Sequence, residues 1–274
     1  MNMFKWMGVL FRRKKARSLK LGLALGSGGA KGFAELGAIK AFEENGIEFD
    51  VVAGTSIGSI IGAFYCDGYS STDILELLKT IDFGEITNLF MMGMDTSGLN
   101  AVIDREIGSK NIEELKKPFM TVATEIVSGD AHVFSSGNVA DALCASSSIP
   151  PFFKPVVIGG ERYVDGAFSN SIPADLVKGM GADYIVGIDL ANHEAKPSLL
   201  SKLFPTYKAK IKEPWKKGYE FSNVMLHPNL NDYNSTSFRR ANEMYDIGYQ
   251  HALSFIPKIK EDIDKLKNPK QKKK

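Results

Sequence analysis

The amino-acid sequence predicts an α/β protein with a mainly parallel central sheet flanked by helices. Short apolar runs that resemble strands alternate with stretches of helical periodicity from about residue 20 to 190. The first such run, Leu21–Leu25, is apolar enough for a strand buried on both faces. It is followed by a helical pattern and a second run, at the usual length of a βαβ unit. A chain of 274 residues can bury one substantial core.

After Leu21–Leu25, alanine and phenylalanine at helical spacing predict a helix over Ala30–Asn45. The apolar residues that follow Asp50 predict the second strand. The C-terminal region is expected to be helical and then disordered. The remaining expected strands are Phe119–Ile126, Ala131–Phe134, Val156–Ile158 and Tyr184–Asp189, and the remaining helices are Ser56–Tyr65, Thr72–Thr80, Leu99–Ile107, Val139–Ala145 and Pro173–Gly179.

The stretch Gly54-Thr55-Ser56-Ile57-Gly58 lies between the second expected strand and an apolar helix. A serine between glycines at a strand-to-helix junction is typical of a nucleophile elbow, whose tight turn exposes the hydroxyl. The glycines allow neighbouring backbone to approach without a Cβ clash. This pattern indicates a serine hydrolase. The alternative interpretation is a glycine-rich turn that begins a buried helix.

A second glycine-rich stretch, Gly26–Gly32, follows the first expected strand and precedes the first helix. Free backbone N–H groups and the helix dipole favour negative charge at such a junction. A nucleotide phosphate is one candidate anion, but the P-loop pattern and a clear dinucleotide fingerprint are missing. A tetrahedral oxyanion is the other anion that such a loop can hold.

The third feature is Asp165-Gly166-Ala167. Taken alone, its Asp-Gly pair is common in turns. In order and spacing, the glycine loop, the Ser56 motif and this aspartate together resemble the patatin-like phospholipase family. Residues 145–156 are similar to the family segment that leads into the aspartate, whereas Ser27 stands where many members have glycine. The resemblance covers about residues 20–190 and implies a patatin-like three-layer sandwich.

The resemblance implies a Ser-Asp dyad in which Ser56 is the nucleophile and Asp165 is the base or proton acceptor. It also implies an oxyanion hole, formed by backbone N–H groups, and supporting glycines in the motifs. The implied oxyanion-hole residues are Gly28, Gly29, Ala30 and Ile57, and the supporting glycines are Gly54, Gly58 and Gly166. No cofactor is expected. No metal site is expected either, because the two cysteines form no CxxC pair and no HExxH occurs.

The reference pKa of an aspartate, about 3.9, predicts that activity lacks an imidazole-like inflection near pH 6.5. The alternative is a triad in the order serine, acid, histidine, for which His193 or His227 would have the right position. Neither of them, nor His132 or His251, lies in a distinctive motif. Each histidine is therefore expected to be solvated or part of the core.

The net charge of +2 is nearly neutral, but the basic residues are clustered. Residues 1–19 combine an amphipathic start with a basic cluster, which suits contact with an anionic membrane surface, or alternatively a frayed tail. The basic-aromatic stretch 196–219 lies in an irregular insertion at about 193–238. It is expected to be an interfacial lid or a solvated loop. No apolar run reaches 18 residues, so no transmembrane helix is expected.

We therefore expect a hydrolase domain over residues 20–262, between the N-terminal segment 1–19 and a basic tail over 263–274. The expected activity is that of a phospholipase A or lysophospholipase that acts on lipid or acyl-ester substrates. The expected location is the cytoplasm, with peripheral contact at the inner membrane surface and no nucleic-acid partner. An acyltransferase or thioesterase with the same dyad is one alternative. A non-catalytic, membrane-associated adaptor that keeps the fold is the other.

Overall fold

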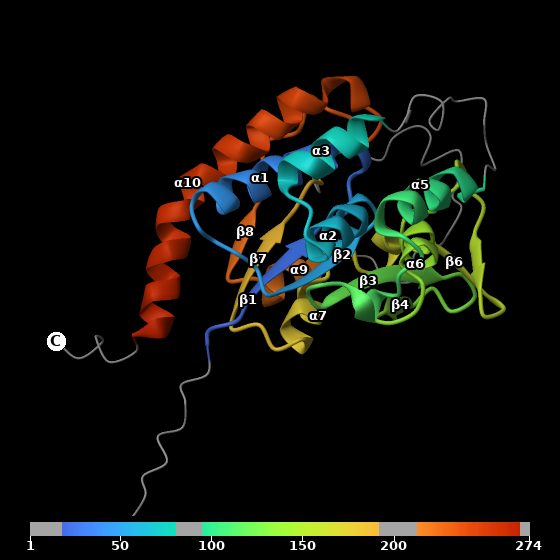
Figure 1. Ribbon diagram of the computed structural model, residues 1–274, viewed down its shortest axis with the longest axis horizontal. Helices are drawn as coiled ribbons and strands as arrows, with labels where there is room; N and C mark the ends of the chain where they lie inside the picture. Colours follow the sequence, from blue (N-terminus) through green and yellow to red (C-terminus); the bar gives the residue numbers. More distant parts are fainter. Residues whose placement is uncertain (1–17, 81–94, 192–212, 269–274) are drawn as a thin grey trace, which may run out of the picture.

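The computed structural model describes residues 18–80, 95–191 and 213–268. A central sheet carries helices on both faces, which confirms the predicted fold class (Figure 1). The strands are β1 (Leu21–Leu25), β2 (Val51–Thr55), β3 (Phe119–Glu125), β4 (Ala131–Phe134), β5 (Val156–Ile158), β6 (Glu161–Asp165), β7 (Tyr184–Ile188) and β8 (Val224–Leu226). The α-helices are α1 (Phe33–Glu44), α2 (Ile57–Asp67), α3 (Ser71–Thr80), α5 (Ser97–Ile107), α6 (Val139–Ser146), α7 (Ala174–Gly179), α9 (Lys216–Phe221) and α10 (Ala241–Lys267). Short 3₁₀ turns are η1 (Gly29–Gly32), η2 (Ile112–Glu114), η3 (Gly166–Phe168) and η4 (Phe238–Arg240).

The sheet has the order β5-β6-β3-β2-β1-β7-β8, with β4 also paired to β3. The five strands from β3 to β8 are parallel, and the β4, β5 and β6 pairings are antiparallel. The predicted βαβ unit is present as β1, α1 and β2. Because parallel strands end at the same edge of a sheet, the loop after β1 and the turn after β2 lie side by side.

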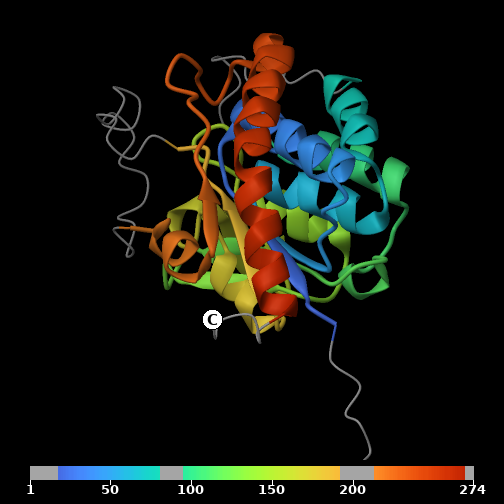
Figure 2. The ribbon, with the colours of Figure 1, turned by 90° about the vertical axis from the view of Figure 1, so that its left-hand side faces the viewer.

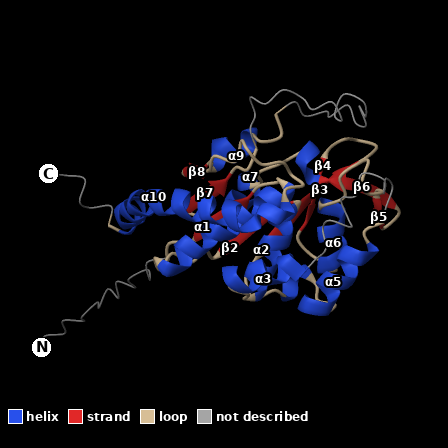
Figure 3. Ribbon diagram, turned by 90° about the horizontal axis from the view of Figure 1, so that it is seen from above, coloured by secondary structure: helices blue, strands red, loops and turns tan. Residues whose placement is uncertain are grey.

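Helices α1, α2, α3, α5 and α6 cover one face of the sheet, and α7 and α9 cover the other (Figure 3). The two faces bury separate apolar clusters. In β1, Leu23 and Leu25 belong to the larger cluster, whereas Ala24 packs with Val177 and Ile185 in the smaller one. This alternation follows from the two-residue period of a strand and explains why β1 is apolar throughout.

The long helix α10 runs along the molecule and crosses α1 (Figure 2). Two glycines allow the two helices to touch backbone to backbone. A Cβ at Gly37 would lie 2.0 Å from the carbonyl oxygen of Tyr245, and a Cβ at Gly248 would lie 1.9 Å from that of Ala34. No side chain larger than hydrogen fits at either position without a shift of one helix.

Several local predictions differ from the structure. Strand β6 was not expected. Helix α9 and strand β8 were not expected either, and they show that residues 213–238 are not irregular throughout. Helix α10 continues to Lys267, beyond the expected domain end at 262, because Ile263 is still buried against the core. The N-terminal segment 1–17 and most of the stretch 196–219 lie outside the described residues. Within the described ranges, every helix is too short or too polar to cross a lipid bilayer.

Candidate active site

Ser56 lies in the turn between β2 and α2 with φ 55° and ψ −124°. It is the one described residue other than glycine that has a positive φ. Such a conformation typically costs about 1–3 kcal/mol and persists only where the surroundings enforce it. Since α2 begins at the next residue, the helix dipole favours negative charge beside the Ser56 hydroxyl. This geometry fits the predicted nucleophile elbow.

The glycines of the motifs are required by close backbone packing. A Cβ at Gly54 would lie 2.1 Å from the carbonyl oxygen of Gly58, and a Cβ at Gly58 would lie 2.6 Å from that of Gly26. A Cβ at Gly166 would lie 2.2 Å from the carbonyl oxygen of Val122. The strand, the elbow and the glycine loop therefore pack at distances that exclude any side chain.

Strand register brings Ser56 and Asp165 to opposite sides of β3. Thr55 pairs with Val122, and Asp165 pairs with the next residue, Ala123. The Ser56 hydroxyl donates a hydrogen bond of 2.7 Å to Asp165 Oδ2. This distance meets the separation of about 3 Å that a nucleophile and its base require.

Asp165 is almost completely buried, with 2% of its surface exposed. Its second oxygen, Oδ1, accepts a hydrogen bond from the Ala167 amide at 2.8 Å. Burial raises the pKa of Asp165 to about 6, although the hydrogen bonds from Ala167 and Ser56 partly oppose this rise. The sequence-based expectation of an activity without an inflection near pH 6.5 used the ordinary pKa of aspartate, which burial raises here. A titration near pH 6 is expected from the carboxyl group itself.

Three of the four histidines are described, and none is hydrogen-bonded to Ser56 or Asp165. His132 packs against Phe134 and Tyr163. His227 lies near Asp189 and Tyr219, and its backbone N–H donates to His251 Nε2. His193 lies outside the described residues. The described part of the chain therefore has a serine–carboxylate pair without an imidazole.

The glycine loop after β1 supplies amides beside the Ser56 hydroxyl. The N–H groups of Gly28, Gly29 and Ile57 have no acceptor among the described residues, and all three residues line the same cavity as Ser56. The predicted contribution of Ala30 is wrong, because its N–H donates to the carbonyl oxygen of Ser235 at 2.8 Å. Three candidate donors therefore remain.

Two buried contacts hold the start of the glycine loop. Gly26 N–H donates to Glu35 Oε1 at 2.7 Å, and Ser27 N–H donates to the Ser171 carbonyl oxygen at 3.0 Å. Ser27 has no positive φ, so its Cβ is tolerated at this position of the loop. Glu35 is fully buried, and its Oε2 has no partner in the described chain. Burial raises the pKa of Glu35 well above its usual range, which favours a neutral carboxyl beneath the loop.

Ser56 and Asp165 open into a cavity of about 230 Å³. Its walls are mainly apolar and include Ile60, Phe152 and Phe153. Ile149, which also lines the cavity, is 40% exposed. The polar lining includes Ser56, Asp165 and the glycine loop. Such a lining suits a hydrocarbon chain whose polar end lies at Ser56.

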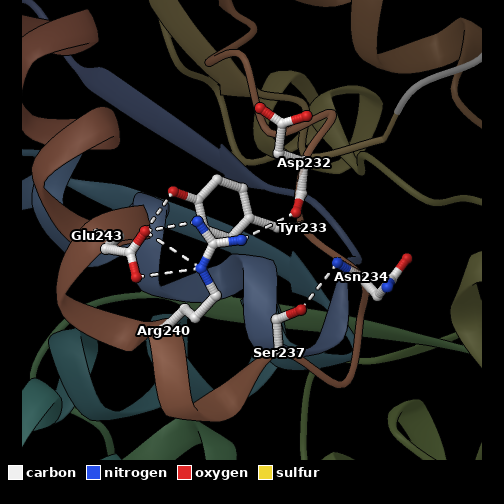
Figure 4. A network of polar contacts seen from close by, with 6 residues as sticks. All are labelled: Asp232, Tyr233, Asn234, Ser237, Arg240 and Glu243. Atoms are coloured by element: carbon white, nitrogen blue, oxygen red, sulfur yellow. Dashed lines mark hydrogen bonds and ion pairs between the residues drawn. The ribbon is translucent and has the colours of Figure 1, made fainter.

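The segment before α10 forms another wall, through Ser235, Thr236 and Phe238. Figure 4 shows the polar network that holds this segment. The Arg240 guanidinium lies 4.1 Å from the centre of the Tyr233 ring, pairs with Glu243 at 2.6 Å and donates to the Asp232 carbonyl oxygen at 3.1 Å. Tyr233 donates its hydroxyl to Glu243, and the Asn234 amide donates to the Ser237 hydroxyl. The network consists of Asp232, Tyr233, Asn234, Ser237, Arg240 and Glu243.

Three residues of the site were missed by sequence reasoning: Glu35, Ser146 and Ser235. Glu35 has a sequence signal, because it is an acid on the apolar face of an otherwise buried helix. Ser146, whose hydroxyl accepts from the Ser56 amide at 2.9 Å, belongs to a serine run to which no role was assigned. Ser235 has no local signal at all. The described residues include no group of three or more His, Cys, Asp or Glu that could hold a metal ion.

Comparison with known proteins identifies similar chains. The chain is 28% identical over 279 residues to "Patatin-like phospholipase domain-containing protein 6" of Mus musculus, covering 84% of this chain and 20% of that protein. It is 27% identical over 292 residues to "Lysophospholipase nte1" of Aspergillus niger, covering 92% and 19% respectively. The chain therefore spans about a fifth of the length of these curated relatives.

The fold is also similar to a solved structure, VipD from Legionella pneumophila. The TM-score is 0.58 at 14% identity, and the match covers 88% of this chain and 67% of that one. The family model described as "Patatin-like phospholipase" matches residues 23–178, which include the glycine loop, the elbow and the aspartate. On this match and the fold, the chain belongs to the patatin-like phospholipase family.

Proposed function

We propose that this chain hydrolyses lipid acyl esters, with Ser56 as nucleophile and Asp165 as base. The single observation that carries the proposal is the 2.7 Å hydrogen bond from the Ser56 hydroxyl to Asp165 inside an apolar cavity. Family membership supports the same activity, since relatives are named phospholipase and lysophospholipase. Because the chain spans only about a fifth of those relatives, we do not assign their substrates to it.

In the proposed reaction, Ser56 Oγ attacks the ester carbonyl carbon while Asp165 accepts the hydroxyl proton. The carbonyl oxygen becomes an oxyanion, and the free amides of Gly28, Gly29 and Ile57 are its candidate donors. Collapse of the tetrahedral intermediate breaks the bond to the alcohol, which leaves with the proton from Asp165. Water, activated by the same carboxylate, then hydrolyses the acyl-enzyme and restores Ser56.

The buried position of Asp165 makes it a better base than an exposed aspartate. A pKa of about 6 is closer to that of the reacting hydroxyl than the ordinary value is. The oxyanion donors must still supply much of the rate, because a serine hydroxyl is far less acidic than the carboxyl group. Loss of one such donor in a hydrolase costs about 3 kcal/mol of barrier.

The test is covalent labelling of the full chain by a fluorophosphonate, together with hydrolysis of p-nitrophenyl esters of increasing chain length. We expect labelling and turnover in the wild type and neither in folded Ser56→Ala. Esters with longer acyl chains should have lower KM, because the cavity walls are apolar. Folded wild-type protein that is neither labelled nor active would support a non-catalytic adaptor instead.

Product analysis distinguishes hydrolysis from acyl transfer. The acyl-enzyme is the same in both reactions, and only the acceptor differs. With alcohol or thiol acceptors added, we expect the free fatty acid to remain the main product. A main product that carries the acyl group on the added acceptor would identify a transferase.

We further propose that the cavity mouth contacts a lipid surface from the cytoplasmic side. Ile149, at the cavity, is 40% exposed, and exposed apolar side chains at a cavity suit a membrane interface. Basic residues in the N-terminal 1–19 segment would add attraction to anionic lipids. Cys66 and Cys144 are buried and unpaired, which is compatible with a reducing compartment.

A further inference from the structure

The C-terminal end of α6 and the turn that follows it contact both members of the Ser56–Asp165 pair. Ser146, the last residue of α6, and Ser148, in the turn, are both fully buried. The Ser146 hydroxyl accepts the Ser56 backbone N–H at 2.9 Å, and the Ser148 carbonyl oxygen accepts the Asp165 N–H at 3.0 Å. Two segments that are distant in sequence are thus connected through one short turn.

The turn is itself well anchored. Ser147 N–H donates to the Leu143 carbonyl oxygen at 3.0 Å, which attaches the turn to the end of α6. The Ser148 hydroxyl donates to the Cys144 carbonyl oxygen at 2.7 Å, one helical turn earlier. Because the Ser146 hydroxyl is held in place, it restrains the Ser56 amide more closely than a solvent molecule would.

The hydrogen bond to Ser146 falls on the most strained backbone position of the site. Ser56 has φ 55°, and its amide has no other acceptor among the described residues. A strained residue relaxes when its restraints are removed. If the Ser56 amide moves, the hydroxyl and the neighbouring Ile57 amide move with it, and both face the reacting carbonyl in the proposed function.

We propose that Ser146 is a positioning residue that holds the Ser56 backbone in its reactive conformation. Ser146 acts through the Ser56 amide and does not touch the substrate. Ser148 stabilises the same turn but uses its hydroxyl only within the helix end. This inference rests on the proposed function for its catalytic consequence, whereas the Ser146–Ser56 contact can be tested independently.

The experiment compares Ser146→Ala with Ser71→Ala, which removes the hydroxyl of an equally buried serine in α3, outside the residues that line the cavity. For Ser146→Ala we expect a fall of about tenfold or more in kcat and in the fluorophosphonate labelling rate. KM should stay within about twofold, since the cavity walls are unchanged. Ser71→Ala should keep kcat within about threefold of wild type, even if its Tm falls as much as that of Ser146→Ala.

Residue-resolved amide hydrogen exchange gives a readout that does not need activity. The Ser56 amide should exchange faster in Ser146→Ala and at the wild-type rate in Ser71→Ala. Unchanged exchange in Ser146→Ala, faster exchange without a fall in kcat, or an equal fall in kcat in both variants would overturn the proposal. If the wild type has no turnover or labelling, the proposed function fails, while the exchange rates still decide whether Ser146 holds the Ser56 amide.

Discussion

Asp165 combines almost complete burial with a proposed role as base, which requires a negative charge. The environment disfavours the charged form, so burial raises its pKa to about 6. Because the pKa is higher in the folded than in the unfolded chain, protonation of Asp165 increases the free energy of unfolding. This contribution is fully present below about pH 4. It is lost as the pH rises through about 6. At neutral pH the carboxylate therefore destabilises the fold that positions it.

The first prediction is that Asp165→Asn raises thermal stability at pH 8 while it abolishes esterase activity. An amide is neutral at every pH and avoids the burial of a charge, a cost on the order of 2–3 kcal/mol here. Thermal unfolding at several pH values measures the effect. The gain over wild type should shrink between pH 8 and pH 4. A gain that does not depend on pH would contradict the assignment.

The second prediction concerns the pH profile of kcat/KM. Activity should rise with pH through an inflection near 6, as Asp165 loses its proton and becomes able to accept one from Ser56. The same inflection should persist in single glutamine variants of His132, His193, His227 and His251. Loss of the inflection in any one of these variants would identify an imidazole base and exclude the dyad.

At the scale of elements, the segment between β8 and α10 links the polar network to the active site. Ser235 accepts the Ala30 N–H, and Phe238 lines the cavity, while Arg240 holds the segment from outside. The Arg240–Glu243 pair is exposed, so its own contribution to stability is small, typically below about 1 kcal/mol. Its effect should therefore be seen in the shape of the cavity wall rather than in global stability.

The third prediction is that Arg240→Ala lowers kcat/KM for long-chain esters by about three- to tenfold. Short-chain esters, which do not need the wall, should be affected less. Arg239→Ala is the matched control, because Arg239 is the neighbouring residue with the same charge and has no hydrogen bond or ion pair in the described structure. Equal losses in the two variants would indicate an effect of charge and contradict the role of the network.

The α1–α10 crossing is a second element-scale feature, and it supports the fourth prediction. Gly248→Ala places a Cβ 1.9 Å from the Ala34 carbonyl oxygen, so we expect a loss of about 2–3 kcal/mol or more in the free energy of unfolding. Gly98→Ala, in the helix α5, meets no atom within 4 Å and should be neutral or stabilising by up to about 1 kcal/mol. Urea denaturation of both variants provides the measurement. A similar stability of the two would show that the helices separate without cost.

The sequence predicted the central strands because they are mainly apolar and alternate with stretches of helical periodicity. It did not predict β6, whose first two residues, Glu161 and Arg162, are polar and exposed. Strand β8 has only three residues, Val224–Leu226, which is too short for a periodic signal. Short strands of this kind form because the neighbouring strand is already in place, and a local pattern does not contain that information.

The candidate site also combines residues that the sequence predicted with features that it could not predict. Ser56 and Asp165 lie in local motifs whose order along the chain carries the signal. The competition for the Ala30 amide could not be predicted, because its acceptor, Ser235, comes from a distant segment. The raised pKa of Asp165 likewise depends on burial by several elements, which no short stretch of sequence reports.

At the scale of the whole molecule, the exposed apolar side chains of the described residues include one that lines the cavity. Ile149 is 40% exposed and lines the cavity, whereas Val127 is 80% exposed but does not line it. If the cavity mouth contacts lipid, Ile149 should contribute to activity on membranes and Val127 should not, although both are exposed β-branched side chains. The difference gives a test of orientation on a membrane.

The fifth prediction is that Ile149→Asp lowers hydrolysis of phospholipid vesicles by about fivefold or more, since it places a charge at the lipid contact. Hydrolysis of a soluble short-chain ester should change much less. Val127→Asp introduces the same charge elsewhere and should leave both activities near the wild-type values. An equal effect of Ile149→Asp on vesicles and on the soluble ester would contradict a membrane contact at the cavity mouth.

The hydrogen bond from Ala30 to Ser235 has a consequence for the order of biosynthesis. Translation proceeds from the N-terminus, so Ser56 and Asp165 leave the ribosome before Ser235, whose carbonyl group restrains the glycine loop. A nascent polypeptide that has not yet reached Ser235 lacks this restraint. On the proposed function, a chain that has not yet reached Ser235 should therefore hydrolyse esters poorly, because its glycine loop is unrestrained.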